Sequence, residues 1–235
     1  MSDFFDFHSH QTENIEEGIS IFSLFPDEKI SREIRGGTYF SCGIHPKFIP
    51  ENKEIDRIFR ILEERLNEEI FLAVGECGLD RLSKTPMPLQ IEMLERQISI
   101  AEKFGKPLVI HCVRSYGELL AVKKNARERN VRFCIHGFSG HPKLAEQLIE
   151  NGFILSFRQE SFRTRKKTES LIAASDGIFF LESDGNLEGV RPVYMSASEI
   201  LGIELEALKE KIMANALEIF PIRNNGTGKP VLKRV

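Results

Sequence analysis

Short apolar runs alternate with longer amphipathic segments along most of the chain. Eight of these runs are candidate strands, and many are rich in Val, Ile and Phe, as strands buried on both faces are. They cover residues 4–8, 18–24, 38–44, 70–76, 107–111, 131–136, 152–157 and 177–182. Helical spacing is clearest at Leu94, Ile98 and Ala101, which are followed by the stop signals Gly105 and Pro107. Similar patterns cover residues 52–67, 116–129, 144–148 and 205–219.

Eight strands that alternate with helices predict the fold class. In 235 residues, this order favours an α/β fold, the closed parallel (β/α)8 barrel of TIM type, as a single domain over residues 1–222. A doubly wound open sheet is the alternative. Residues 223–235 include Asn-Asn-Gly-Thr-Gly-Lys-Pro, which predicts a loose C-terminal tail.

Composition narrows the class of protein. Hydrophobic residues make up 41% of the chain, which excludes a disordered protein. No apolar run approaches the roughly 18 residues of a membrane span, and the first residues lack the pattern of a secretory signal. The four cysteines form no C-x-x-C pair and are too few for a disulfide scaffold. We therefore expect a cytoplasmic protein with no membrane partner.

The charge balance limits how the protein can bind nucleic acid. It has 32 Lys and Arg against 35 Asp and Glu, a net charge of −3. A protein that holds nucleic acid by electrostatics alone usually carries a basic excess. Any phosphate binding must therefore depend on a local feature such as a metal site or a basic loop.

Histidines and carboxylates recur at the ends of the predicted strands. His8 and His10 are two apart, so both side chains point to one side of the first strand. With the residues that end or follow four later strands, the set is His8, His10, Glu76, His111, His136 and Asp184. Strand ends converge at one mouth of a barrel, and imidazole and carboxylate are ligands that zinc accepts. This placement predicts a divalent-metal site.

Each of these residues also has an ordinary structural explanation. A carboxylate at a strand end can cap a helix or form a surface ion pair, and a single buried histidine needs only a hydrogen bond. The recurrence of all six residues at the same edge of successive strands favours the metal site.

Several segments are similar to those of a known family. They are D-F-H-S-H at 6–10, G-I-H-P at 43–46, V-G-E-C-G-L-D at 74–80, P-L-V-I-H at 107–111, I-H-G-F-S-G at 135–140, L-E-S-D at 181–184 and N-A-L-E-I-F at 215–220. In this order they resemble the TatD family of metal-dependent deoxyribonucleases, within the amidohydrolase-like barrels.

The resemblance implies a ligand set and a reaction. One divalent ion would be held by His8, His10, Glu76 and Asp184, and a second by Glu76, His111 and His136. The ions would be Zn, Mn or Mg. The implied reaction is hydrolysis of DNA phosphodiester bonds, in single strands or at ends, by a metal-activated water, with Asp184 and Glu76 as catalytic residues and no obligate protein partner.

Basic residues near the strand ends are candidates for substrate binding. His45 follows the third strand, and Arg114 follows His111 into a loop, so both are expected to neutralise charge on the phosphate. Arg158, Arg163 and Arg165 follow the seventh strand and are expected to guide a phosphate backbone. For the run at 163–167, the alternative is the solvated first turn of a helix.

Two other functions remain open from the sequence. The metals could serve hydrolysis of a small ester, amide or lactone, or the barrel could bind metal or a protein partner without catalysis. The cysteines are not expected to be ligands. Cys77 and Cys112 each follow a proposed ligand directly and so face the other way, and Cys134 is expected in the core.

Overall fold

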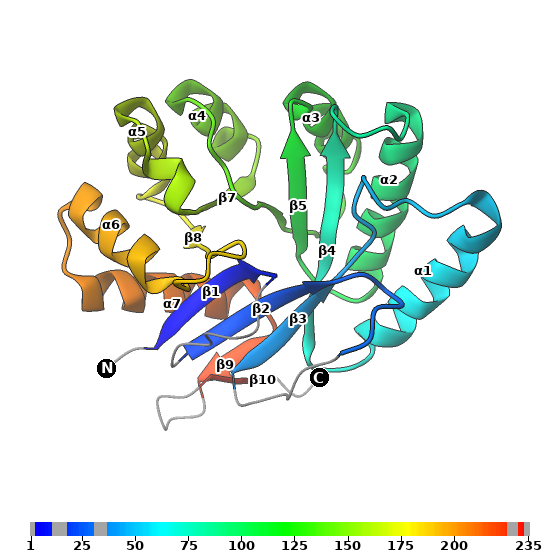
Figure 1. The fold of residues 1–235 in the computed structure, drawn as a ribbon, viewed down its shortest axis with the longest axis horizontal. Helices are drawn as coiled ribbons and strands as arrows, with labels where there is room; N and C mark the ends of the chain where they lie inside the picture. The colour runs from blue at the N-terminus through cyan, green and yellow to red at the C-terminus, as the bar shows by residue number, and fades with distance from the viewer. Residues whose placement is uncertain (1–2, 11–17, 31–36, 225–229, 233–235) are drawn as a thin grey trace. The chain divides into compact units, whose positions relative to one another are not determined.

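The computed structural model describes residues 3–10, 18–30, 37–224 and 230–232 (Figure 1). For residues 166, 167 and those from 223 onward, only the backbone is described. The described residues form two compact units. The first comprises those within 1–22, 34–39 and 136–235, and the second those within 23–33 and 40–135.

The first unit contains the first two and the last two strands of the eight-stranded sheet. They are β1 (Phe4–Ser9), β2 (Gly18–Leu24) through Phe22, β7 (Phe153–Phe157) and β8 (Phe179–Leu181). Strand β1 pairs in parallel with β2, and β7 with β8. Just beyond β8, the Asp184 N–H donates to the His8 carbonyl at 3.0 Å. The last strand, β8, therefore adjoins the first, β1. A closed barrel requires this contact, and an open sheet does not have it.

Aromatic packing holds β1 and β8 together in the first unit. The Phe7 and Phe180 rings stack with centroids 4.9 Å apart, and Phe5 packs on both Phe180 and Phe220. Tyr194 donates its hydroxyl to the Phe5 carbonyl at 2.9 Å. This core fixes the strand ends that carry His8 and Asp184.

Four α-helices and one short 3-10 helix, Gln159–Phe162, belong to the described residues of the first unit. The α-helices are α4 (Pro142–Glu150), α5 (Arg165–Ala174), α6 (Arg191–Leu201) and α7 (Leu205–Ile219). Figure 1 shows α6 and α7 next to β1, and α4 next to β7. Pro142 and Pro192 stand in the first turns of α4 and α6, where a missing N–H costs no helical hydrogen bond.

The second unit contains parallel strands in sequence order. They are β3 (Thr38–Cys42) from Phe40 on, β4 (Phe71–Asp80), β5 (Leu108–Val113) and β6 (Phe133–Ile135). Val74 lies opposite Leu108, and Leu108 opposite Phe133. Every residue of β4 is buried, as predicted for strands covered on both faces. Strand β4 runs four residues past its predicted end, so all of G-E-C-G-L-D is strand.

Three helices complete the second unit: α1 (Asn52–Leu66), α2 (Met87–Lys103) and α3 (Tyr116–Asn125). Helix α2 packs along β4 (Figure 1). The helix predicted over 116–129 ends at Asn125, because the chain turns there before the buried Val131 and strand β6. The two sets of elements together confirm the predicted eight strands.

The end of the chain contains a short hairpin. Strand β9 (Ile222–Asn224) pairs antiparallel with β10 (Pro230–Leu232), and all of these residues except Ile222 belong to the segment predicted to be a loose tail. Residues 225–229 and 233–235 of that segment lie outside the described part of the chain. Among the described residues, no helix is both long enough and apolar enough to cross a membrane.

Candidate functional site

The first unit brings together His8, His136 and Asp184. One ligand atom from each lies within 4.8 Å of the others. His8 is fully buried near the end of β1, and its ring centroid lies 4.3 Å from that of His136. The His8 Nε2 atom is 3.8 Å from Asp184 Oδ1. Two imidazoles and a carboxylate form a donor set that suits a divalent ion such as zinc.

His10 joins this group, as its spacing from His8 predicts. Its Nε2 atom lies 3.1 Å from His8 Nε2 and 3.8 Å from Asp184 Oδ1. The His10 side chain is 48% exposed, whereas that of His8 is not exposed. His8 is thus held in the core, whereas the His10 side chain is accessible to solvent and to a ligand.

Two charged residues support this group. The Arg158 guanidinium contacts Asp184 Oδ2, although the sequence indicated a role in substrate binding. Glu182 is fully buried, and its Oε1 atom lies 3.4 Å from His136 Nδ1. Such a carboxylate fixes the orientation of a ligating imidazole. Sequence reasoning missed Glu182, although its position two residues before Asp184 was a signal.

A buried acid joins the ends of β1 and β8. Asp6 accepts hydrogen bonds from the Ser183 N–H at 2.9 Å and the Ser183 hydroxyl at 2.6 Å. Burial raises the Asp6 pKa from 3.8 to about 7, although the hydrogen bonds from Ser183 lower it. The motif D-F-H-S-H contains Asp6, but nothing in its spacing predicts contact with Ser183, which is 177 residues away.

The second unit has its own group, formed by His45, Glu76 and His111. One ligand atom from each lies within 4.8 Å of the others. The Glu76 Oε1 atom is 2.8 Å from His111 Nδ1 and 3.2 Å from His45 Nε2. His45, which the sequence placed with the substrate, therefore shares a carboxylate oxygen with a predicted metal ligand.

A second carboxylate holds His111 from its other edge. Asp80 Oδ2 lies 3.2 Å from His111 Nε2 and 3.1 Å from the Lys47 ammonium. Burial raises the pKa of Asp80, but hydrogen bonds from the Leu82 N–H, Lys47 and His111 outweigh burial and hold the pKa below 3.8. Asp80 is therefore ionised at neutral pH.

The motif G-E-C-G-L-D explains why these two carboxylates face the same way. Side chains alternate along a strand, so residues 76, 78 and 80 share one side of β4. The middle one is Gly78, where a Cβ would lie 2.0 Å from the His111 carbonyl oxygen. Glycine there lets β5 approach with His111 between the carboxylates. The role of Asp80 beside His111 was not apparent from the motif itself.

His45 is partly buried and has a shifted pKa. Burial lowers the His45 pKa below 6.5, and this outweighs the opposing effect of Glu76. The imidazole is therefore neutral at pH 7, the form in which histidine binds metals. Neutralisation of phosphate charge, which the sequence suggested for His45, would require the protonated form.

Two buried glutamines on α2 position the backbone of this group. Gln97 accepts from the Ile44 N–H at 2.7 Å and donates to the Ile44 carbonyl at 3.2 Å. Gln90 makes the same two contacts with Asp80, at 2.7 and 3.1 Å. They are seven residues apart and so lie on one face of the helix. Sequence reasoning missed both, because an isolated glutamine gives no sign of its partner.

The predicted substrate-binding arginines lie in different surroundings. Arg114 is exposed after β5, and its carbonyl accepts a hydrogen bond from Arg81 Nε at 2.9 Å. Arg163 pairs with Glu160 at 3.3 Å, and Arg165 pairs with Glu169 at 3.7 Å. Helix α5 begins at Arg165, so the backbone from Arg165 on forms the first turn of a helix, which was the alternative for this basic run. Their proposed contact with phosphate stays a prediction.

The four cysteines are buried free thiols. Burial raises the pKa of Cys42, Cys112 and Cys134 to about 12. The pKa of Cys77 is raised further for the same reason. Thiols with such pKa values stay protonated at neutral pH and behave as small core residues.

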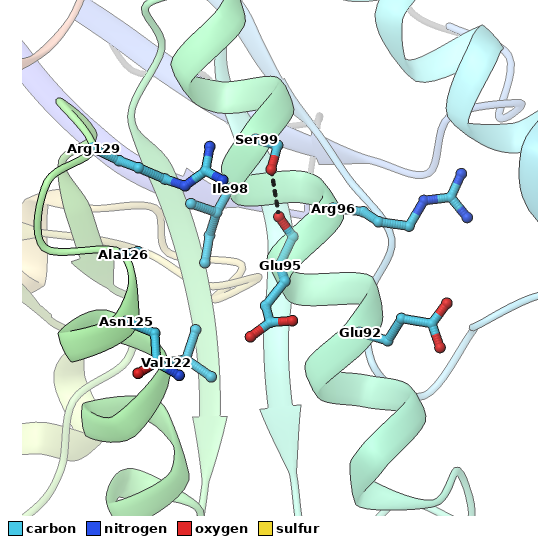
Figure 2. A pocket seen from close by; sticks show the side chains of 9 residues that line it. All are labelled: Glu92, Glu95, Arg96, Ile98, Ser99, Val122, Asn125, Ala126 and Arg129. Carbon is cyan, nitrogen blue, oxygen red and sulfur yellow. Dashed lines mark hydrogen bonds between the residues drawn. The ribbon is translucent and has the colours of Figure 1, made fainter.

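A cavity of about 440 Å³ lies between α2 and α3 in the second unit. Figure 2 shows Glu95 and Ile98 on α2 and Val122, Asn125 and Arg129 on the facing segment. Its lining contains no histidine, cysteine or aspartate. We therefore place the candidate site at the two histidine groups and not in this cavity.

Comparison with known proteins identifies the family. The family described as TatD related DNase matches residues 8–221. The chain belongs to the TatD family. An uncharacterized metal-dependent hydrolase of Methanocaldococcus jannaschii is 25% identical over 197 residues, which cover 79% of this chain and 76% of that protein. The 3′-5′ RNA nuclease TATDN2 of Homo sapiens is 32% identical over 126 residues, 53% of this chain and 16% of that protein.

The chain spans only about half the length of several curated relatives that it matches, between 43% and 52% of each. A solved structure, the TatD homologue YjjV of Escherichia coli, matches with a TM-score of 0.74 and 21% identity, covering 88% of both chains. This likeness shows the fold. It confirms the predicted TIM-type barrel against the doubly wound alternative.

Proposed function

We propose that this TatD-family chain is a divalent-metal-dependent hydrolase that cleaves phosphodiester bonds in nucleic acid, with DNA as the first substrate to test. The observation that carries the proposal is the grouping of imidazoles around carboxylates in each unit. His8, His136 and Asp184 form one group, and His45, Glu76 and His111 form the other.

The donors in both groups fit a divalent cation. All are imidazole nitrogens or carboxylate oxygens, the ligands of zinc and manganese sites. Glu182 and Asp80 each lie against an imidazole of one group, as supporting carboxylates do in metal sites. His10 is the natural further ligand in the first group. We propose Zn, Mn or Mg, one or two ions per chain.

A bound divalent ion would supply a water of lowered pKa and polarise a phosphoryl oxygen. The protein's own residues would do the rest. Asp184 Oδ1 faces His8 and His10, while Oδ2 is held by Arg158. Asp184 Oδ1 would therefore accept the proton of the attacking water. Glu76 would hold its oxygen between two imidazoles and orient both.

Arginines would meet the negative charge of the phosphate. Arg158 stands beside Asp184 and its side chain is about one-third exposed, so a phosphate oxygen would reach part of this side chain from solvent. Arg114 is exposed just after β5, the strand that carries His111. Because the net charge is −3, binding would depend on such local cations and on the metal.

A chelation experiment tests the proposal. The purified protein is treated with a chelator, and cleavage of single-stranded DNA, duplex DNA and single-stranded RNA is measured before and after Mn²⁺, Zn²⁺ or Mg²⁺ is restored. RNA belongs in the panel because a human relative is named an RNA nuclease. We expect activity that is lost on chelation and returns with metal. Cleavage indifferent to the chelator, or no cleavage of any of the three nucleic acids with any of the metals, would overturn the proposal.

Two substitutions test the residues. His111→Ala and Asp184→Asn should each remove most of the turnover and leave the far-ultraviolet circular dichroism spectrum unchanged. Asp176→Asn is a matched control, because Asp176 is an exposed carboxylate in the first unit. Unchanged turnover in both test variants would show that His111 and Asp184 do not carry the reaction and would overturn their assigned roles.

A further inference from the structure

Phe48 is a large aromatic side chain left in solvent beside the second histidine group. Its side chain is 65% exposed, although most phenylalanines of this chain are buried. The Phe48 and His45 ring centroids are 5.3 Å apart, at 42° to each other. The Phe48 N–H also donates to the His45 carbonyl at 2.9 Å. A short turn therefore holds the Phe48 backbone beside His45, and the exposed ring contacts the His45 ring, whose Nε2 atom lies 3.2 Å from Glu76 Oε1.

The same ring lines a pocket of about 340 Å³ in the second unit. Apolar walls come from Phe25, Phe48, Pro50 and Ile58, and Asp27, Glu54 and Arg57 supply the polar groups. The pocket is near the lower end of the roughly 300–1,000 Å³ usual for small-ligand sites. One residue, Phe48, thus borders both this pocket and the histidine group.

The polar groups of the pocket indicate what it can accept. Arg57 is already engaged, by Asp27 at 2.9 Å and Glu54 at 2.6 Å. Two carboxylates against one guanidinium leave a net negative charge, which disfavours a phosphate. Free carboxylate lone pairs accept hydrogen bonds from amino groups such as the exocyclic amine of cytosine. Aromatic and apolar walls suit the flat face of a base.

We propose that Phe48 and the pocket beside it bind one nucleobase of the substrate, next to the phosphate that reaches the His45–Glu76–His111 group. This inference rests on the proposed function, because it assumes a nucleic-acid substrate. The base stacks on the Phe48 ring, and its amino edge faces Asp27 and Glu54. Bases with an exocyclic amine are therefore preferred to thymine at this position.

The absence of tryptophan from the chain gives a direct test. Phe48→Trp introduces a single indole fluorophore at an exposed position. A single-stranded DNA pentamer with uncleavable phosphorothioate linkages is titrated in, and then a pentamer of abasic residues with the same backbone. We expect the first to quench the indole emission and the second to leave it unchanged. Equal quenching by both, or quenching by neither, would overturn the proposal.

Phe48→Ala measures the contribution of the ring. Loss of a base–aromatic stack should weaken binding of the base-containing pentamer by about tenfold and leave abasic binding unchanged, and Phe48→Tyr should retain most of the affinity. The matched control is Leu82→Ala, because Leu82 is also exposed, at 61%, and does not line the pocket. An equal loss for both oligomers in Phe48→Ala would overturn the proposal.

The binding assay separates this inference from the proposed function. Suppose that the wild-type chain cleaves DNA and that Phe48→Ala binds both pentamers as the wild type does. The proposal of base binding at Phe48 is then rejected, and the proposal of nuclease activity is retained. Suppose instead that the wild type cleaves no nucleic acid, while the fluorescence of Phe48→Trp is quenched only by the base-containing pentamer. The proposal of base binding is then retained, and the proposal of nuclease activity is rejected.

Discussion

Asp80 Oδ2 lies 3.2 Å from Nε2 of His111. The opposite nitrogen of the same ring, Nδ1, lies 2.8 Å from Glu76 Oε1. His111 is thus held between a carboxylate that is a candidate ligand and a second carboxylate that is fully buried. Asp80 acts on His111 from behind, so we regard it as a positioning residue.

Substitution of Asp80 should weaken metal binding without removing a ligand. Asp80→Asn keeps the size of the side chain and loses the charge that orients His111. Because such supporting carboxylates contribute about 10- to 100-fold to metal affinity, we expect a loss of that order. A titration of Zn²⁺ or Mn²⁺ against a competing chelator measures it.

Asp56→Asn is the control for this experiment. Asp56 is exposed on α1 and pairs with Arg96 at 2.8 Å, so its loss should leave metal affinity unchanged. An Asp80→Asn protein that binds metal as the wild type does would show that Asp80 serves only to hold Lys47 and the Leu82 N–H.

Arg158 should affect metal binding and turnover in opposite directions. Its guanidinium contacts Asp184 and competes with a divalent ion for that carboxylate. Arg158→Met should therefore bind metal at least as tightly as the wild type, while turnover falls by about 100-fold because a donor to the phosphate is lost. The exposed Arg60 on α1 gives a matched Arg60→Met control. A parallel loss of metal affinity and turnover in Arg158→Met would contradict this role.

The glycine of the segment G-I-H-P is required by close packing. A Cβ on Gly43 would lie 2.6 Å from the Gly75 Cα atom, and no flexible side chain there can move aside. Gly43→Ala should lower the free energy of unfolding by about 2 kcal/mol. Denaturant unfolding monitored by circular dichroism measures the change.

Gly117→Ala is the contrasting substitution. Gly117 stands in α3, and a Cβ there meets nothing within 4 Å. Alanine should raise the free energy of unfolding by about 0.5–1 kcal/mol, because it lowers the entropy of the unfolded chain. Equal effects of the two substitutions would refute the packing explanation for Gly43.

The lowered pKa of Lys106 should make the free energy of unfolding depend on pH in the alkaline range. Burial lowers its pKa from 10.5 to about 8, and its ammonium contacts the Phe71 carbonyl. Between these values the unfolded chain binds more protons than the folded chain, so the free energy of unfolding rises with pH. We expect a rise on the order of 2 kcal/mol from pH 8 to 10.5, which Lys106→Met should abolish.

The control for Lys106 is Lys103→Met. Lys103 is exposed and pairs with Glu63 at 2.6 Å, so this variant should retain the rise. Denaturant unfolding at several pH values provides the comparison. A Lys106→Met protein whose stability follows the same alkaline profile as the wild type would show that another group causes the rise.

The thiols should be inert in the folded protein. All four are buried, and burial raises the pKa of each. A thiol reagent such as DTNB should therefore release no colour from the native protein and react with all four thiols in denaturant. Fast labelling of a thiol in the native state would place that cysteine in an accessible site instead.

Local patterns in the sequence determined the elements and the kinds of donor. Runs of Val, Ile and Phe identified all eight strands, because burial on both faces demands a continuous apolar run. The two-residue spacing of His8 and His10 predicted that both rings face one side, because alternation along a strand is a local geometric property, and the Nε2 atoms of both lie 3.8 Å from Asp184 Oδ1. Glu76 and Asp80 share one side of β4 for the same reason.

Only the tertiary structure decided which distant residues meet. Asp80 contacts His111 from 31 positions away, and Glu182 contacts His136 from 46. Gln97 reaches Ile44 from 53 positions away. Such contacts depend on strand register and on how a helix packs over the sheet, and no local spacing encodes either. The sequence therefore identified the candidate donor residues, and packing between distant elements decided which residues support them.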